Sequence, residues 1–207
     1  LGKLDAAQAS YRLAVGLKPG QAEIHYCLGR ILTRLRRLDE AAECFRRAGM
    51  LRPDFVEAHS SLGSILEDLG RLEEAAASYR RVLDLKPDFL EVHGNLGNVY
   101  TGLGQLELAS ASYKRLLEIQ PDNAEAHSNL GVAYNELGRF DDAMASYRRA
   151  LELNPAYAGV HNNIGNLLKD LGQLDGAEVS FREGLSIKPD DTDVHSNLVF
   201  LHTYRSE

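Results

Sequence analysis

The stretch AEAHSNLGVAYNELGRFDDAMASYRRALELNPAY, residues 124–157, decides the fold, because it is one copy of a unit that recurs along the whole chain. The chain has six prolines, and they stand 34 residues apart, at Pro19, Pro53, Pro87, Pro121, Pro155 and Pro189. A histidine keeps the same step from His25 to His195, and an alanine keeps it from Ala7 to Ala177. An aromatic residue follows each of these alanines by four positions. A fixed period of this length is typical of a solenoid built from stacked repeats.

Each unit is predicted to form two antiparallel helices. In three successive units an acidic residue is followed three positions later by glutamate, as in Asp54 and Glu57. This spacing indicates a capping box at the start of the first helix. The first helix then carries Leu-Gly, as in Leu96 and Gly97. Glycine inside a helix costs about 1 kcal/mol, so we expect it where two helices approach closely.

The landmarks of the second helix predict how the units pack. Its alanine is expected to allow the same close approach, and its aromatic residue is expected to fill the space between units. No unit can cover its own apolar face, so we expect each unit to be stabilised by stacking on the next. The turn inside each unit is marked by Leu-Gly, as in Leu69 and Gly70, whereas the first complete unit has Arg36 at the glycine position.

The 34-residue spacing, with Leu-Gly early, Ala and Phe or Tyr in the middle and Pro at the end, resembles the tetratricopeptide repeat. The resemblance implies an all-α, right-handed superhelical solenoid of antiparallel helix pairs. Five complete units are predicted, at residues 22–55, 56–89, 90–123, 124–157 and 158–191. Residues 1–21 are interpreted as a second helix without its first, and residues 192–207 as a first helix without its second. We therefore expect the chain to be a fragment of a longer protein.

The two end helices are expected to leave apolar surface uncovered. In the last helix this surface would comprise Leu198, Val199, Leu201 and Tyr204. Self-association through the exposed end helices is therefore one expected mode of assembly.

Composition disfavours several classes of partner. The net charge of −7 disfavours general binding to nucleic acid or to anionic membranes. The sequence contains neither a signal peptide nor an apolar run that could span a bilayer. Two cysteines, Cys27 and Cys44, provide no disulfide framework and suit a reducing compartment. A cytoplasmic location is expected.

The regular histidines do not indicate a metal site or a catalytic site. Equivalent residues of successive units lie about 10 Å apart, whereas zinc binds its ligands at about 2 Å. Ser196 stands beside His195 and Asp193, but neighbours on a helix point away from one another. No phosphate-binding loop or nucleophile motif is present. We expect the histidines to serve packing, and we predict no enzymatic activity, no cofactor and no metal in this segment.

Asparagine supplies the polar series that is most informative about binding. Asn95, Asn129, Asn163 and Asn197 occupy one place in four successive first helices, and Asn98 and Asn166 stand three residues further on. The resemblance implies that first helices line a concave groove. An amide can both donate and accept, so a ladder of amides can pair with a peptide backbone of any sequence. The alternative is that these residues serve local hydrogen bonding.

Charge is predicted to divide the groove along its length. Arg30 and Arg34 occupy two successive turns of one first helix. The matching places in later units hold Ser64 with Asp68, Val132 with Glu136, and Asn166 with Asp170. We expect acidic peptide residues to bind near the arginines, and the alternative is a set of solvated surface charges.

Units of the form HSNLGxxxxxLGxxxxAxxSYRRALxLxPD also resemble the superhelical array of protein O-linked N-acetylglucosamine transferases and their bacterial relatives. The closing HSNLVFLHTY is similar to the segment that leads toward the catalytic domain in that group. The pattern departs at Cys27 and Ser61, where the ladder should have asparagine. The resemblance implies a scaffold that binds extended protein substrates in its groove for a transferase domain. The alternatives are a direct part in glycosyl transfer, a structural oligomerisation module, and a co-chaperone-type adaptor.

Overall fold

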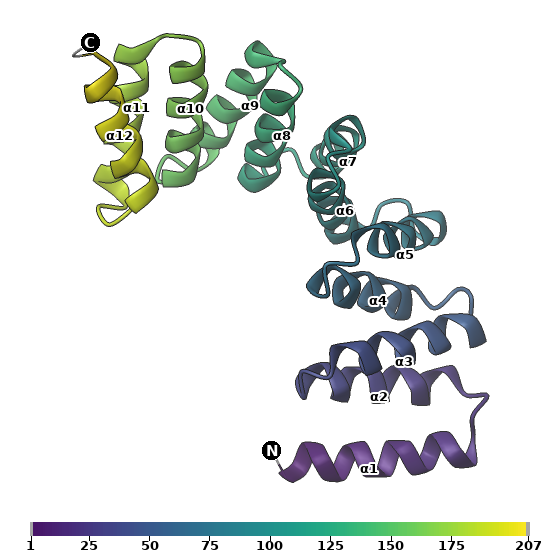
Figure 1. The fold of residues 1–207 in the computed structure, drawn as a ribbon. Helices are drawn as coiled ribbons and strands as arrows, with labels where there is room; N and C mark the ends of the chain where they lie inside the picture. The colour runs from purple at the N-terminus through teal and green to yellow at the C-terminus, as the bar shows by residue number, and fades with distance from the viewer. Residues whose placement is uncertain (1, 206–207) are drawn as a thin grey trace. The chain divides into compact units, whose positions relative to one another are not determined.

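The structure is a computed structural model that describes residues 2–205, except for the side chains of residues 2, 3, 202, 204 and 205. Within residues 2–205 the chain forms twelve α-helices and no β-strand, which confirms the predicted all-α fold class (Figure 1). The helices are α1 (Gly2–Leu17), α2 (Ala22–Arg34), α3 (Leu38–Leu51), α4 (Val56–Asp68), α5 (Leu72–Leu85), α6 (Leu90–Gly102), α7 (Leu106–Ile119), α8 (Ala124–Glu136), α9 (Phe140–Leu153), α10 (Ala158–Asp170), α11 (Leu174–Ile187) and α12 (Thr192–Arg205). They form two compact units, which we call unit 1 (Leu1–Gln105, with α1 to α6) and unit 2 (Leu106–Glu207, with α7 to α12).

Neighbouring helices pack as antiparallel pairs within each unit. The most extensive packing joins α2 with α3 and α4 with α5 in unit 1, and α8 with α9 and α10 with α11 in unit 2. Three residues connect the two helices of a pair, as residues 69–71 do between α4 and α5. A link this short forces the second helix to run back along the first.

The predicted close approach occurs at the glycine of the first helix. A Cβ atom added at Gly63 would lie 2.5 Å from Cε1 of Tyr79, and one added at Gly165 would lie 2.5 Å from Cε1 of Phe181. Both rings are fully buried. The aromatic ring therefore packs inside its own helix pair. The prediction placed the ring between successive 34-residue repeats and did not include this contact.

The turn inside each pair ends the first helix in the left-handed region of backbone conformation. After α4, the N–H of Arg71 donates to the carbonyl of Leu66 and the N–H of Gly70 donates to that of Glu67, which is a Schellman motif. Gly70 has a φ of 71°, and Arg36 has a φ of 59° at the equivalent place after α2. Arg36 is the one non-glycine residue with positive φ among the described residues.

The predicted capping box is wrong, because the acidic residue lies one position before the N-cap. Pro53 and Asp54 are the central residues of a β-turn, which the N–H of Phe55 closes by donating to the carbonyl of Arg52 at 3.0 Å. Proline favours this turn because its ring sets the φ that the second turn position requires. Phe55 is therefore the N-cap of α4, its side chain does not cap the helix, and its ring is buried instead.

The N-caps of α6 and α8 follow the same register. Phe89, rather than Asp88, is the N-cap of α6. Asn123, rather than Asp122, is the N-cap of α8, and its side chain accepts a hydrogen bond from the N–H of Ala126 at 2.8 Å.

The six histidines of the 34-residue series, from His25 to His195, bind the turns that precede their helices. Nε2 of each histidine lies within hydrogen-bond distance of the carbonyl oxygen of the proline six residues earlier, from 2.7 Å at His93 to 3.4 Å at His161. A carbonyl oxygen only accepts, so Nε2 must carry the proton and donate. The histidines thus hold each turn against its first helix, through a hydrogen bond that the prediction of packing histidines did not include.

The last helix is covered more fully than its sequence suggested. Leu201 and Val194 are buried against Ala177 and Phe181 of α11, and Leu198 packs against the same cluster. The expected exposure of Leu198 and Leu201 is therefore wrong, because that face of α12 packs on the preceding pair. Val199 and Phe200 are exposed, at 66% and 58%. The side chain of Tyr204 lies outside the described part of the chain.

Candidate functional site

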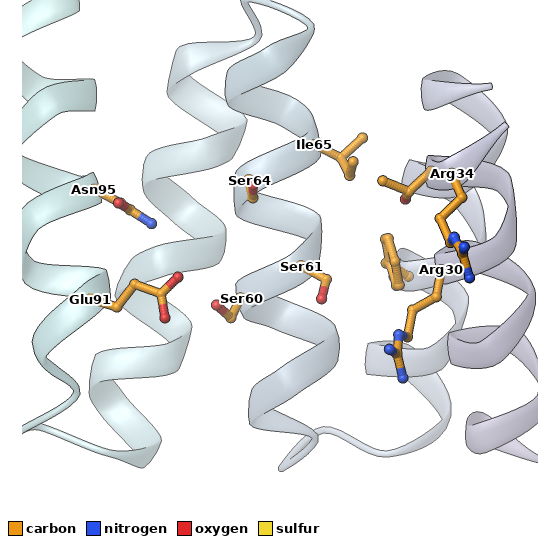
Figure 2. Close-up of a pocket in the computed structure, with 10 residues that line it drawn as sticks. Arg30, Arg34, Ser60, Ser61, Ser64, Ile65, Glu91 and Asn95 are labelled. Atoms are coloured by element: carbon orange, nitrogen blue, oxygen red, sulfur yellow. The ribbon is translucent and has the colours of Figure 1, made fainter. Parts of the chain in front are cut away.

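A pocket of about 360 Å³ lies in unit 1, along the first helices of three successive pairs, and polar side chains line it together with the apolar Phe45 and Ile65. Figure 2 shows Arg30 and Arg34 of α2 on one side, Glu91 and Asn95 of α6 on the other, and serines of α4 between them. The repeat explains this convergence, because equivalent positions of successive first helices face the same way. The site is thus assembled from residues up to 65 positions apart in the sequence.

Arg30 and Arg34 form a cationic wall. They are one helical turn apart, so they share a face of α2, and both are exposed. The guanidinium of Arg30 lies 5.9 Å from the centroid of the Tyr26 ring. Other arginines of unit 1, such as Arg46 and Arg71, form ion pairs with glutamates. Within the described residues Arg30 and Arg34 form none, so their charges remain available to a ligand.

Serine hydroxyls line the middle of the pocket. Ser60, Ser61 and Ser64 all belong to α4. Serines in a helix commonly donate to a carbonyl one turn earlier, as Ser78 does to Glu74 at 2.9 Å. The side-chain hydroxyls of the three pocket serines form no hydrogen bond of this or any other kind within residues 2–205. Their hydroxyls can therefore donate to, or accept from, a bound group.

The amide of Asn95 is held by a relay of hydrogen bonds from the core. The hydroxyl of Tyr79 donates to Oε2 of Glu67 at 3.0 Å. Because that hydroxyl has one proton, its oxygen can only accept from Asn95, whose Nδ2 lies 3.4 Å away. The relay therefore decides which end of the amide faces Tyr79. It leaves Oδ1 of Asn95 and one N–H free for other partners.

Burial shifts both ionisable groups of the relay toward their neutral forms. Burial raises the pKa of the Tyr79 hydroxyl, and the nearby Glu67 raises it further. Burial also raises the pKa of Glu67, although the hydrogen bond from Tyr79 acts in the opposite direction. Tyr79 therefore stays protonated at neutral pH and remains the donor to Glu67.

The structure brings together three of the eight predicted site residues in this pocket, namely Arg30, Arg34 and Asn95. Asn98 is exposed on α6 but is not among the residues that line the pocket. In unit 2, Asn129 on α8 and Asn163 on α10 are partly exposed.

Asn166 and Asn197, the remaining two, meet in unit 2 through a residue that the prediction did not include. Asn162 accepts from Asn197 Nδ2 at 3.2 Å and lies 3.5 Å from Asn166 Nδ2. Lys169 donates to Oδ1 of Asn166 at 3.3 Å. These amides therefore already bind one another, so part of the predicted ladder serves local hydrogen bonding.

Sequence reasoning missed Glu91, the pocket serines and the relay to Tyr79. Ser60 and Ser64 stand four residues apart, so their shared helix face could have been recognised. The part played by Tyr79 could not, because a repeat landmark gives no sign that its hydroxyl reaches another helix pair.

None of the helices in residues 2–205 combines the length and apolar character that a membrane span requires. In the same residues, His, Cys, Asp and Glu side chains form no group of three that could hold a metal ion.

Comparisons with known proteins agree with the repeat architecture. Models described as tetratricopeptide repeat match residues 22–55, 124–157 and 146–179, and a model described as TPR repeat matches residues 63–104 and 97–138. No curated protein sequence matches the chain significantly.

Solved structures resemble the chain over most of its length. YrrB, described as a TPR protein with an unusual peptide-binding site, has a TM-score of 0.77 at 19% identity, over 90% of this chain and 96% of YrrB. MamA has a TM-score of 0.70 at 25% identity, over 76% and 92%. A thermophilic TPR protein of Thermus thermophilus has a TM-score of 0.63 at 26% identity, over 88% and 99%. The chain therefore belongs to the tetratricopeptide repeat family, whose fold supports a scaffold for protein–protein interaction.

Proposed function

We propose that this array binds extended segments of partner proteins along its first helices, and that the pocket of α2, α4 and α6 is one of its binding sites. One observation carries the proposal: polar side chains from three successive first helices converge on one pocket. An extended peptide presents its backbone N–H and C=O groups at regular intervals. Amide and hydroxyl side chains can pair with those groups whatever the peptide sequence is.

The ladder of asparagines is the proposed backbone-binding element. In unit 1 the relay presents the amide of Asn95 to the pocket. In unit 2 the partly exposed Asn129 and Asn163 are the candidates with the same role. Arg30 and Arg34 would add affinity for acidic side chains.

Replacing the ladder tests the proposal. Peptides selected for binding to the parent from a random library would be titrated against Asn95→Ala/Asn129→Ala/Asn163→Ala. At about 1 kcal/mol per hydrogen bond, the loss of affinity should be tens-fold or more. Helicity and melting temperature should not change.

The matched control removes three exposed amides from helix connections, as Gln21→Ala/Gln105→Ala/Gln173→Ala. The control should bind like the parent. Unchanged affinity in the asparagine variant would contradict the proposal.

A narrower form of the proposal follows from the resemblance to O-linked N-acetylglucosamine transferases. In that form, the bound segments are substrates that the array presents to a transferase domain of the same protein. An assay for transfer of N-acetylglucosamine to protein, performed on the longer protein that would contain this array, tests it. If that longer protein had no transferase activity, this form of the proposal would be contradicted, while the proposal of peptide binding would stand.

Self-association is the second candidate, and exposed apolar side chains of the end helices favour it. Leu13 and Leu17 of α1 are 67% and 73% exposed, and Val199 and Phe200 of α12 are also exposed. Sedimentation of the parent and of Val199→Asp/Phe200→Asp would reveal assembly through α12. A monomeric parent would contradict this candidate.

A further inference from the structure

We infer that the pocket of unit 1 selects peptide segments of mixed charge, with an acidic side chain at Arg30 and Arg34 and a basic side chain at Glu91. The inference rests on the proposed function, since it assumes that an extended segment lies across α2, α4 and α6. It adds the chemistry of the ligand: two side chains of opposite charge at a defined spacing.

The α2 side of the pocket offers hydrogen-bond donors. A guanidinium has several N–H donors and no acceptor, and it binds carboxylates through two parallel hydrogen bonds. Arg30 and Arg34 are exposed and form no ion pair within the described chain. An acidic side chain of a ligand would therefore meet two unpaired cations here.

The α6 side of the pocket offers acceptors. Glu91 is exposed, lines the pocket and forms no ion pair with any described residue. Beside it, Asn95 has its Nδ2 directed to Tyr79, which leaves Oδ1 as an acceptor. A lysine or arginine of the ligand can donate to both. The two walls of the pocket thus have opposite charge and opposite hydrogen-bonding character.

The serines of α4 suit the polar backbone that joins the two ligand side chains. Ser60, Ser61 and Ser64 have hydroxyls that no described residue uses, and a hydroxyl both donates and accepts. The middle of the pocket can therefore bind peptide N–H or C=O groups in either chain direction.

The spacing of the walls sets the spacing of the ligand charges. Neighbouring packed helices lie about 8–10 Å apart, and α4 lies between α2 and α6 (Figure 2). Long side chains reach inward from α2 and α6, which shortens the distance between the two walls. We therefore expect the bound charges to be roughly 10–15 Å apart, which an extended peptide covers in about three to five residues.

The probes are four short extended peptides that are identical except at two positions about four residues apart. One peptide carries Glu and Lys at these positions, and the others carry Glu at both, Lys at both, or Ser at both. Binding would be measured at low and at physiological ionic strength. The parent should bind the mixed peptide about tenfold more tightly than either like-charged peptide at low salt. Salt should reduce that preference, because the pocket is open to solvent.

Reversing one wall at a time should change the preferred peptide. Arg30→Glu/Arg34→Glu makes both walls acidic, so it should prefer the peptide with two lysines. Glu91→Arg makes both walls basic, so it should prefer the peptide with two glutamates. Arg47→Glu/Arg80→Glu and Glu73→Arg change the net charge by the same amounts at exposed positions of α3 and α5 outside the pocket. These control variants should retain the parent's preference.

The outcomes separate the inference from the function on which it rests. If the mixed, like-charged and neutral peptides bind the parent equally, or if the wall variants keep its preference, charge selection is overturned while peptide binding stands. If control and wall variants shift alike, the net charge of the array, and not the pocket, causes the preference, and the inference also fails. If no probe binds at either salt concentration, peptide binding in this pocket is itself contradicted.

Discussion

Unit 1 and unit 2 share one framework but present different side chains on their first helices. Both units place an aromatic ring on the glycine of the first helix, as Tyr79 does on Gly63 and Phe181 on Gly165. The residues that line the pocket do not repeat in the same way. Arg30 and Arg34 of unit 1 are matched in unit 2 by Asn166 and Asp170 on α10, and by Val132 and Glu136 on α8. Framework positions therefore specify the fold, whereas the positions that line the pocket vary from pair to pair, and we propose that they specify the ligand.

Tyr79 of unit 1 differs in its hydrogen bonds from two core aromatics of unit 2, Tyr147 and Phe181. Tyr79 links its own helix pair to α6, through Glu67 on one side and Asn95 on the other. In unit 2, Phe181 has no hydroxyl, and Tyr147 makes no hydrogen bond to a described residue. Position 67 is matched by Asn135, a neutral residue. In unit 1, Tyr79 is thus a packing residue that also connects the core to the pocket.

The largest expected difference between the units is the cost of filling the framework glycine. Overpacking costs about 1–3 kcal/mol, and replacing glycine by alanine in a helix recovers about 1 kcal/mol. Hydrogen bonds hold the Tyr79 ring in place, whereas Phe181 has no hydroxyl through which it could be held. We expect Gly63→Ala to cost about 2 kcal/mol of unfolding free energy and Gly165→Ala about 1 kcal/mol.

Urea unfolding measures both costs. Gly184→Ala is the control, because its added Cβ would meet no atom closer than 3.4 Å. It should be neutral or slightly stabilising. Equal costs at Gly63 and Gly165 would show that the hydroxyl relay does not hold the ring.

Removing the hydroxyl of Tyr79 should have the next largest effect. Tyr79→Phe leaves the partly buried Glu67 without its donor, and a hydrogen bond to a charged group contributes about 1.5–3 kcal/mol. Because Glu67 is partly exposed, we expect a loss of about 1.5 kcal/mol. Tyr147→Phe in unit 2 removes a hydroxyl without a described partner, so we expect a loss of about 0.5 kcal/mol or less. Thermal unfolding of the two variants tests the difference, and similar losses would contradict it.

Exchanging turn residues between the units should shift stability in opposite directions. A non-glycine residue in the left-handed region costs about 1–2 kcal/mol, part of which glycine loses again through its greater freedom in the unfolded chain. Arg36→Gly should therefore stabilise by about 0.5–1 kcal/mol, and Gly172→Arg should destabilise by about 1 kcal/mol.

Arg37→Gly separates the turn effect from the loss of an arginine. Arg37 has a φ of −93°, and its guanidinium pairs with Glu40. This variant should gain no stability. Stabilisation by Arg37→Gly as large as that by Arg36→Gly would refute the conformational explanation.

The smallest expected difference concerns pH. Burial raises the pKa of Glu67 above its ordinary value of 4.5. A carboxyl group whose folded pKa is raised contributes stability that is fully present below pH 4.5 and is lost as pH rises through the folded pKa. The unfolding free energy of the parent should thus decline with pH in that window more steeply than that of Glu67→Gln. Asn135, the equivalent residue of unit 2, cannot titrate, so Asn135→Gln should leave the pH profile of the parent unchanged.

The sequence by itself determined the repeat and the helix pairs. A step of 34 residues held by proline, histidine, glycine, alanine and an aromatic residue is visible in the printed chain. Each landmark answers a local need: proline forms the turn, Gly70 takes a positive φ, and Gly63 allows close approach. Because the same local geometry recurs in every repeat, the spacing of these residues indicates the fold.

Only the tertiary structure decided which polar residues meet. Asp54 has the spacing of a helix cap, but the turn around Pro53 places Phe55 at the cap. Leu201 has the pattern of an exposed end residue, but α11 covers it. Arg30 and Glu91 lie 61 positions apart, and they share a pocket because α2, α4 and α6 present equivalent faces. The physical reason is that a contact between pairs depends on the register of helices far apart in sequence. The repeated residues, in contrast, serve the turn and the packing inside a single pair.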